Sequence, residues 1–367
     1  MKICLVMIVK NESRVLRRSL ESVKALCDYA LICDTGSTTN EFYVMSSIIE
    51  EVLTTRGVEY QFHKEPWVDF ATNRTIALRL AEQQFPDATH LLMLDADDYI
   101  TDCAAFGLTD AEGFRVHVTD GSIQYPREQL FKAGVGWRYR GVVHEFPELT
   151  GAHIEDAPIM LRSTREGARN QDPDKYRKDA DLLYRALNNA DCPADLIPRY
   201  QFYLAQSYDN ADDYLRAERW YRERMNNENG YVEERYMSAY RLALIYYRQH
   251  KGPLQVEALC RAAQDLCPQR KEAANLAMRA LNEGGLHARA LEIWREWPVT
   301  TEKVNGLFVE PDVYQWKAYE QGGIAAFYCQ QHKLSALLFL KALKGVPNKP
   351  LDVQRLTDNV AFSIDKL

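Results

Sequence analysis

The sequence predicts an amino-terminal α/β domain with a mixed, mostly parallel sheet over residues 1–175, followed by an all-α domain of helical repeats over residues 176–367. Three observations lead to this fold class. Strand-like and helix-like stretches alternate up to about Asp156, and one apolar run among them ends in a group of carboxylates. From Tyr176 onward, aromatic and alanine positions instead recur with helical spacing, and Gly and Pro fall between helix pairs.

The α/β part begins with four strands that are separated by three helices. Apolar runs predict strands at residues 2–9, 29–33, 59–62 and 90–94, and apolar periodicity predicts helices at 13–27, 42–56 and 70–84. Such alternation favours a parallel sheet with helices on both faces. Beyond Asp95 the pattern is less regular. We expect strands at 113–118 and 124–131, an aromatic-rich excursion over the site at 137–147, and a basic loop at 162–178.

The helical part contains four approximate copies of one pattern, in which large, small and aromatic residues follow each other at fixed offsets. The copies begin at Leu204, Leu242, Leu276 and Ile324. This pattern is similar to that of tetratricopeptide repeats, and a non-repeating helical domain is the alternative. Because stacked helix pairs form a curved surface, this part is expected to bind a partner or a peptide.

The composition is that of an ordinary globular protein, with 46% hydrophobic and 26% charged residues. The net charge of −7 argues against non-specific binding to nucleic acids or anionic membranes. The first strand has only seven apolar residues, which are too few for a signal peptide or a membrane span, so we expect no transmembrane segment. The eight cysteines include no C-x-x-C pair, which indicates a reducing compartment and a cytoplasmic protein.

The carboxylates Asp95, Asp97 and Asp98 follow directly on the apolar run 90–94. In open α/β sheets, ligands bind at the carboxyl ends of the strands, and carboxylates this close repel one another unless a cation or a hydrogen-bonding ligand neutralises them. A purely structural alternative has Asp97 and Asp98 cap a helix while Asp95 bonds a turn. The Asp-Ala-Asp sequence also resembles the nucleophile motif of haloacid-dehalogenase phosphatases. That motif follows the first strand and continues with Thr, so it does not fit here.

The D-x-D motif of nucleotide-sugar glycosyltransferases fits the position of Asp95-Ala96-Asp97, and further motifs agree with it. They are Met7–Glu12, Asp34–Thr38, Trp67–Phe70 with Asn73-Arg74, Arg140–Glu145, Gly167–Arg169, Asp172–Tyr176 and Phe202–Tyr208. In this order the chain resembles family-2 glycosyltransferases, which have the Rossmann-like GT-A fold. It resembles in particular the subgroup that carries carboxy-terminal tetratricopeptide-like repeats.

The resemblance implies a nucleotide-sugar pocket and a metal site. Asp97 would bind Mn²⁺ or Mg²⁺ directly, Asp95 would contact the metal's water shell or the ribose, and the metal would bridge to the diphosphate. The implied nucleotide-sugar-binding residues are Val9, Asn11, Glu12, Asp34, Asn73, Arg74, Asp95, Ala96, Arg165 and Arg169. Asp34 suits a uracil imide, with capping of the turn at Gly36 as the structural alternative, and the Arg74 fork suits phosphate oxygens.

Glu145 and His144 are the candidate catalytic residues. Family members with this motif suggest that Glu145 is the base that deprotonates the acceptor, and that His144 orients the acceptor or a phosphate. The alternatives are a Glu145 that pairs with Arg138 or Arg140 and a buried, hydrogen-bonded His144. The resemblance leaves the last protein ligand of the metal open, because related proteins often carry a His where this chain has residues 159–162.

Together these features predict a metal-dependent inverting glycosyltransferase, a hexosyltransferase, with a nucleotide-sugar donor that we expect to be a UDP-sugar. The repeats would position the acceptor or form a homodimer. A peptide, protein or glycan acceptor is favoured over nucleic acid. The competing hypothesis is a non-catalytic repeat scaffold with a degenerate nucleotide-sugar-binding domain. A sugar-1-phosphate nucleotidyltransferase would need a Gly-rich, Arg-containing loop where this chain has residues 10–13.

Overall fold

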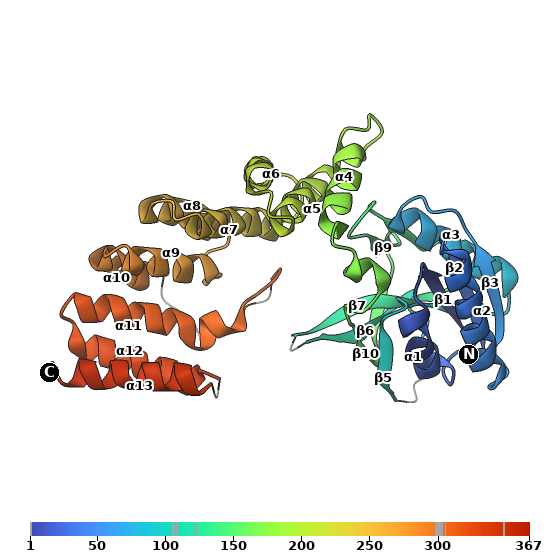
Figure 1. Cartoon of the computed structure of the whole chain (residues 1–367), viewed down its shortest axis with the longest axis horizontal. Helices are drawn as coiled ribbons and strands as arrows, with labels where there is room; N and C mark the ends of the chain where they lie inside the picture. The colour runs from blue at the N-terminus through green and yellow to red at the C-terminus, as the bar shows by residue number, and fades with distance from the viewer. Residues whose placement is uncertain are drawn as a thin grey trace. The chain divides into compact units, whose positions relative to one another are not determined.

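The computed structural model describes residues 2–104, 107, 109–121, 123–297, 304, 306–347 and 349–367. The chain divides into two compact units, unit 1 (Met1–Leu182) and unit 2 (Leu183–Leu367). Unit 1 is an α/β domain, drawn from blue to green in Figure 1, and unit 2 is all-helical. The fold class predicted from the sequence is therefore confirmed.

Unit 1 contains an eight-stranded mixed sheet with the strand order β3-β2-β1-β4-β7-β6-β10-β5. The first four strands in this order are mutually parallel, as are β6 and β10, whereas β7 and β5 run antiparallel to their neighbours. The strands are β1 (Ile3–Val9), β2 (Tyr29–Asp34), β3 (Glu59–Lys64), β4 (His90–Met93), β5 (Tyr99–Cys103), β6 (Gly113–Asp120), β7 (Ile123–Lys132) and β10 (Ile154–Arg162). A separate two-stranded sheet pairs β8 (Arg138–Arg140) with β9 (Phe146–Glu148).

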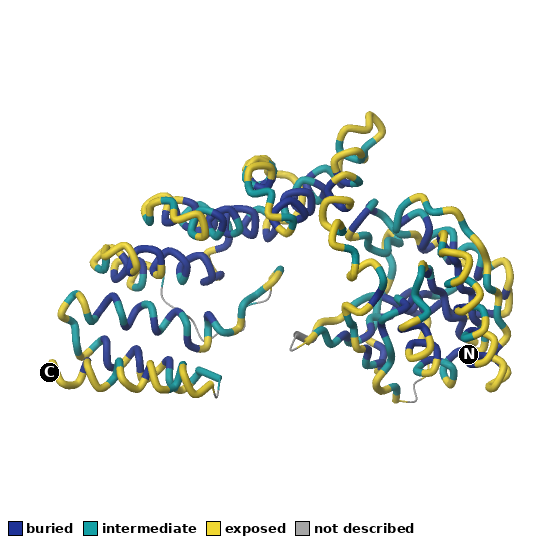
Figure 2. The backbone as a smooth tube through the Cα atoms, in the orientation of Figure 1, coloured by how far each residue is buried: buried dark blue, intermediate teal, exposed yellow. Residues whose placement is uncertain are grey.

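Apolar side chains of the central strands point alternately to the two faces of the sheet, and helices cover both faces. In β1, Leu5 and Met7 point into one hydrophobic cluster and Cys4 and Val6 into the other. Helices α1 (Ser13–Val23) and α2 (Thr39–Thr54) pack on the first cluster, and α3 (Phe70–Gln84) packs on the second. Figure 2 shows the buried strands between these layers. All three helices occupy the stretches where apolar periodicity predicts them.

The sequence-based prediction lacks four strands of the irregular part, which are β8 and β9 of the small sheet and β5 and β10 of the main sheet. β5 follows the acidic turn after only a few residues, and β10 passes through Asp156 and Pro158, where its register with β6 shifts. Residues 159–162, where related proteins often carry a metal-binding His, thus belong to a sheet strand, with Ile159 and Leu161 buried in its core. The expected basic loop is shorter than predicted, because it gives way to the 3₁₀ turn η1 (Ala168–Gln171) and to α4 (Lys175–Leu187).

Unit 2 is built from consecutive helices that pack pairwise. They are α5 (Ile197–Asn210), α6 (Tyr214–Asn226), α7 (Val232–Arg248), α8 (Pro253–Leu266), α9 (Glu272–Glu283), α10 (His287–Glu296), η2 (Val313–Lys317), α11 (Ala318–Tyr328), α12 (His332–Gly345) and α13 (Pro350–Ile364). Small residues from the repeated pattern are buried where neighbouring helices meet, including Ala205, Ala217, Ala243 and Ala277. Among the described residues, no helix is both long and apolar enough to cross a membrane.

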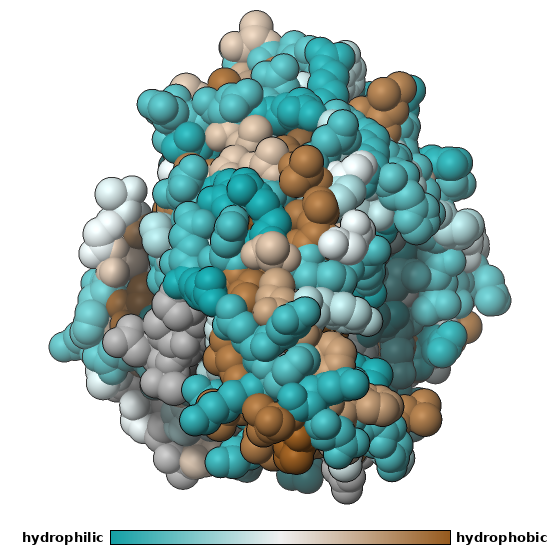
Figure 3. Space-filling view, turned by 90° about the vertical axis from the view of Figure 1, so that its left-hand side faces the viewer, coloured by the Kyte–Doolittle hydropathy of each residue, from teal (hydrophilic) through white to brown (hydrophobic). Residues whose placement is uncertain are grey.

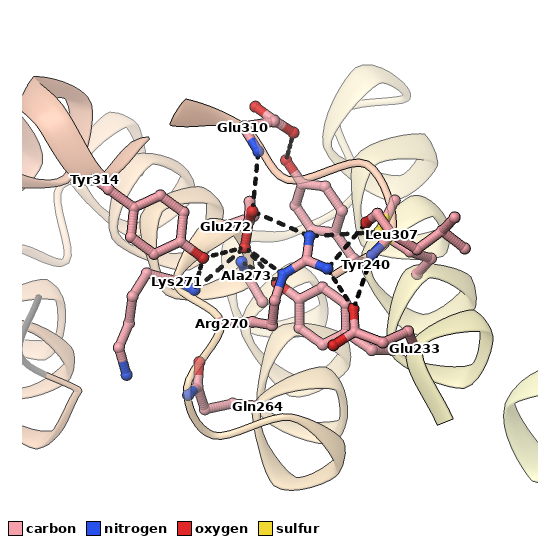
Figure 4. Close-up of polar contacts among 12 residues, drawn as sticks. Glu233, Tyr240, Gln264, Arg270, Lys271, Glu272, Ala273, Leu307, Glu310 and Tyr314 are labelled. Carbon is pink, nitrogen blue, oxygen red and sulfur yellow. Dashed lines mark hydrogen bonds and ion pairs between the residues drawn. The ribbon is translucent and has the colours of Figure 1, made fainter. Parts of the chain in front are cut away.

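A buried charge network joins two of these helices to the segment that precedes η2 (Figure 4). Arg270 is fully buried, forms an ion pair with Glu233 of α7 and donates to both carboxylate oxygens of Glu272 at 3.0 Å. Glu272 also accepts from the backbone N–H of Glu310 at 3.1 Å and from the Tyr314 hydroxyl at 2.9 Å. The network therefore fixes residues 306–314 against α7 and α9.

The outer helices of unit 2 carry several exposed apolar side chains. The end of unit 2 that faces the viewer in Figure 3 is largely hydrophilic, with separate hydrophobic patches. The large apolar residues exposed on α12 and α13 are Leu337, Leu340, Leu351, Phe362 and Ile364. A homodimer formed through the repeats stays a prediction.

Candidate functional site

The carboxyl ends of β1, β2 and β4 meet at one edge of the sheet because these strands are parallel neighbours. Val9, the last residue of β1, lies beside Asp34, the last residue of β2. The backbone N–H of Leu94 donates to Val6 at 3.0 Å, which extends the pairing of β4 with β1 to the residue before Asp95. The acidic group therefore lies at the edge where parallel sheets bind their ligands.

Arg74 of α3 joins two of the predicted site residues. Its Nη2 donates to Asp95 Oδ1 at 2.5 Å and its Nε to Glu145 Oε1 at 2.7 Å. The Arg74 side chain is only 10% exposed, so it is a buried cation between two carboxylates and not a surface arginine. Burial would raise the pKa of Asp95, but the Arg74 charge opposes this strongly enough to hold that pKa below its usual value.

Glu145 reaches Arg74 from the turn between β8 and β9. Gly141 has φ +100°, a backbone conformation that residues with a Cβ rarely adopt, so the turn favours glycine there. His144 also has a positive φ, of 53°, and is exposed to solvent. The second carboxylate oxygen of Glu145 has no hydrogen-bond partner within the described part of the chain.

The alternative partners for Glu145 were wrong. Arg138 and Arg140 both pair with Glu148 on the neighbouring strand β9, at 2.6 and 2.8 Å. These three residues belong to the small two-stranded sheet, where their side chains are brought together across the strands. Glu145 instead pairs with Arg74, which lies 71 positions earlier in the chain.

Asp97 and Glu12 are partly buried carboxylates that accept hydrogen bonds from consecutive backbone N–H groups. Gly167 N–H donates to Asp97 Oδ2 at 3.0 Å, and Ala168 N–H donates to Glu12 at 3.1 Å. Burial raises the pKa of Asp97, and Asp95 adds to this although the Gly167 bond opposes it. Burial likewise raises the pKa of Glu12 to about 7, against the bond from Ala168.

The segment before Gly167 is also attached to the acidic turn. Thr164 Oγ1 donates to the Asp97 carbonyl at 2.8 Å, and Arg18 Nη2 donates to the same carbonyl at 3.3 Å. Arg18 also pairs with Glu166 at 2.6 Å. Residues 164–168 of the basic loop therefore lie against Asp97 and Glu12.

Asp98 does not cap a helix, because strand β5 follows it. It is almost fully buried and pairs with Arg127 of β7 at 2.5 Å. Burial raises the pKa of Asp98 to about 6, with Asp95 adding to the effect and Arg127 opposing it. Sequence reasoning did not single out Arg127, because nothing local distinguishes it from other strand arginines.

The turns after β1 and β2 are tied to each other. Asn11 has φ +57°, its N–H donates to Ser37 Oγ at 2.8 Å, and its Oδ1 accepts from Thr38 N–H at 2.9 Å. Asp34 is buried and accepts from the Ser37 N–H at 3.3 Å, which is the capping geometry considered as its structural alternative. The Val9 carbonyl accepts from Thr35.

The other predicted nucleotide-binding residues lie in different environments. Asn73 is fully buried and holds the segment before α3 by accepting from Val68 N–H and donating to the Pro66 carbonyl, both at 2.9 Å. Ala96 is packed in the hydrophobic core. Arg165 has a largely exposed side chain that pairs with Asp120 at 3.3 Å. Arg169 pairs with Asp179 and lies over the ring of Phe70 at 4.2 Å.

The oxygen donors at this edge fit a hard divalent cation that takes most of its ligands from elsewhere. The described residues contain no group of three or more His, Cys, Asp or Glu side chains able to enclose a metal. Mg²⁺ typically binds through one or two carboxylates and completes its shell with water and substrate phosphates, and Mn²⁺ also favours such oxygen ligands. The carboxylate oxygens of Asp97 and Glu12 are of the kind that Mg²⁺ or Mn²⁺ would take as ligands.

Comparison with known proteins adds little to this description. No protein-family model matches the chain, and no curated protein matches it. The crystal structure of BtubC (BKLC) from P. vanneervenii is similar over 55% of this chain and 85% of its own, with 13% sequence identity and a TM-score of 0.36. These values are too low to support a conclusion about fold or function, so the function depends on the site itself.

Proposed function

We propose that unit 1 is a metal-dependent inverting glycosyltransferase that uses a nucleotide-sugar donor, with UDP as the expected nucleotide. The observation that carries the proposal is the Asp95–Arg74–Glu145 contact, since it brings the D-x-D motif and the candidate base to one place. An inverting displacement needs both a stabilised leaving group and a base on the acceptor. Arg74 contacts a residue that serves each requirement: Asp95 of the D-x-D motif on the side of the leaving group, and Glu145 as the candidate base.

Each residue has a distinct part in this proposal. Asp97 would hold Mn²⁺ or Mg²⁺, which would supply charge stabilisation to the departing diphosphate. Arg74 orients Glu145 by binding one of its oxygens and leaves the other to accept the acceptor's proton. Asp95 is committed to Arg74 through one oxygen, which favours a role beside the ribose over direct metal binding. The helical unit would position the acceptor, for which a peptide, protein or glycan is expected.

A donor-hydrolysis screen tests this function before any acceptor is known. Wild-type protein is incubated with UDP-, GDP- and dTDP-sugars and Mn²⁺ or Mg²⁺, and release of the nucleoside diphosphate is measured. Asp97→Ala should lose hydrolysis, whereas Asp102→Ala, an exposed aspartate five positions later on β5, should retain it. Circular dichroism checks that both variants fold.

Two outcomes would contradict the proposal. Asp97→Ala with wild-type hydrolysis would remove the metal role. A wild-type protein that neither hydrolyses a donor nor gives heat in calorimetric titrations with nucleoside diphosphates and Mn²⁺ would favour the non-catalytic scaffold.

A further inference from the structure

Several arginines near the acidic turn are already matched to carboxylates within the protein. The arginines around the turn and the segment over it form five sets of ion pairs: Arg18 with Glu166, Arg74 with Asp95 and Glu145, Arg127 with Asp98, Arg165 with Asp120, and Arg169 with Asp179. An arginine whose charge is balanced inside the protein gains less from an incoming anion, because it must give up or share its present partner. These arginines are therefore poor candidates for the main anion contact.

Lys175, the first residue of α4, has a different kind of partner. Its Nζ donates at 2.6 Å to Asn170 Oδ1, which is an uncharged amide, and no carboxylate of the described residues lies within 4.0 Å of it. The residue is half-buried, and burial lowers the pKa of Lys175. Arg169 lowers it further, while Asp179 and Asp97 partly offset this, so the ammonium lies within electrostatic reach of the acidic turn.

Lys178, one helical turn later, shows the contrast. Its side chain is 64% exposed and pairs with Asp172 at 2.5 Å. A partly desolvated ammonium without a counter-ion is electrostatically unfavourable, and an anion that binds beside it recovers that cost. Lysine suits phosphate in this role because it acts as a compact point charge with three donors.

We propose that Lys175 is the principal protein cation that contacts the diphosphate of the donor, in place of the arginines Arg74, Arg165 and Arg169. The inference rests on the proposed function, because the diphosphate is that of the nucleotide-sugar. Lys175 here is a binding residue, and its amide partner Asn170 holds the ammonium in place until the anion arrives. The alternative is that Lys175 only braces the 3₁₀ turn η1 through that same amide.

Calorimetric titration with UDP and with uridine, both with Mn²⁺, separates these roles. Lys175→Met should weaken UDP binding roughly tenfold or more and leave uridine binding unchanged, because uridine lacks the phosphates. Lys178→Met is the matched control and should bind UDP as the wild type does. Lys175→Arg should restore part of the affinity, since it returns the charge.

A second variant tests the charge argument with the lysine in place. Asn170→Asp supplies Lys175 with an internal counter-ion and should also weaken UDP binding while uridine binding is retained. The inference is overturned if Lys175→Met binds UDP within twofold of the wild type, or if it loses UDP and uridine equally, as a bracing role requires. Wild-type protein that binds none of the nucleoside diphosphates overturns the proposed function as well, whereas unchanged binding by the variant alone overturns only the role of Lys175.

Discussion

Replacing Glu12 with Gln should stabilise unit 1 at pH 8 and have little effect at pH 4.5. Burial raises the pKa of Glu12 to about 7, whereas an unfolded glutamate titrates near 4.3. Between these values the folded state binds more protons than the unfolded state. The stability that Glu12 contributes is therefore present in full below pH 4.3 and is lost as pH rises through 7. Gln cannot ionise, so the variant avoids this loss.

The size of the effect follows from the shift. A rise from about 4.3 to about 7 is about 2.7 pH units, and at about 1.4 kcal/mol per unit this gives a ceiling of about 3.7 kcal/mol. The Glu12 carboxylate is partly exposed, so solvent screening reduces the expected gain to about 1–2 kcal/mol. Gln keeps an oxygen for the Ala168 N–H, which limits the change to the charge.

Hydrogen–deuterium exchange in a urea series measures the stability of unit 1 within the full chain, using peptides from β1 and β4. Variant and wild type are compared at the same pH, so the intrinsic exchange rates cancel. Glu59→Gln, on the exposed edge strand β3, is the control and should show no difference between the two pH values beyond error. A Glu12→Gln effect that is equal at pH 4.5 and pH 8, or that is destabilising at pH 8, would refute the argument.

Three further predictions concern buried charges and the outer surface of the helices. Arg74→Met should destabilise unit 1 by about 3–5 kcal/mol, because Asp95 and Glu145 then lose their cationic partner. Glu145→Gln in the same chain should recover part of this loss when both variants are compared by urea unfolding in a double-mutant cycle. Additive effects of the two substitutions would contradict the pairing. Arg270→Met should cost unit 2 about 3–5 kcal/mol by urea unfolding, since the fully buried Glu272 loses its partner, and an unchanged midpoint would count against this. If the repeats form a homodimer, Leu340→Glu should halve the mass found by light scattering, and a wild type that is already monomeric would reject the dimer.

The first strands and helices could be predicted from the sequence because their apolar side chains repeat with a clear period. In β1 the side chains from Ile3 to Val9 are nearly all buried on one face or the other, so even its ends are well defined. β5 and β10 lack that signal. β5 has no fully buried residue, and Asp156 and Pro158 interrupt β10 where its register shifts. Their places in the sheet depend on pairing partners distant in sequence, which periodicity does not report.

The sequence singles out candidate site residues but does not indicate how their side chains pair. Asp97 and Glu145 belong to short motifs, so local sequence was enough to single them out. The partner of Glu145 was not local. Arg138 and Arg140 are close to it in sequence, yet the strand pairing gives both to Glu148, and the fold supplies Arg74 from a helix on the face of the main sheet. Which arginine pairs with Glu145 depends on the three-dimensional positions of the side chains, and residue spacing in the sequence does not indicate it.

The balance of charge at the sheet edge distinguishes the carboxylates from one another. Asp95 shares Arg74 with Glu145, and Asp98 has Arg127, so these acids are compensated within the protein. Asp97 and Glu12 accept only backbone N–H groups from the segment over the site, and in the described part of the chain no cationic side chain lies within 4.0 Å of either carboxylate. Of the four acids Asp95, Asp97, Asp98 and Glu12, folding therefore leaves Asp97 and Glu12 without a cationic partner among the described residues. A divalent cation that binds there relieves a cost that the protein already bears, which is the physical reason for assigning the proposed metal to Asp97 and not to Asp95 or Asp98.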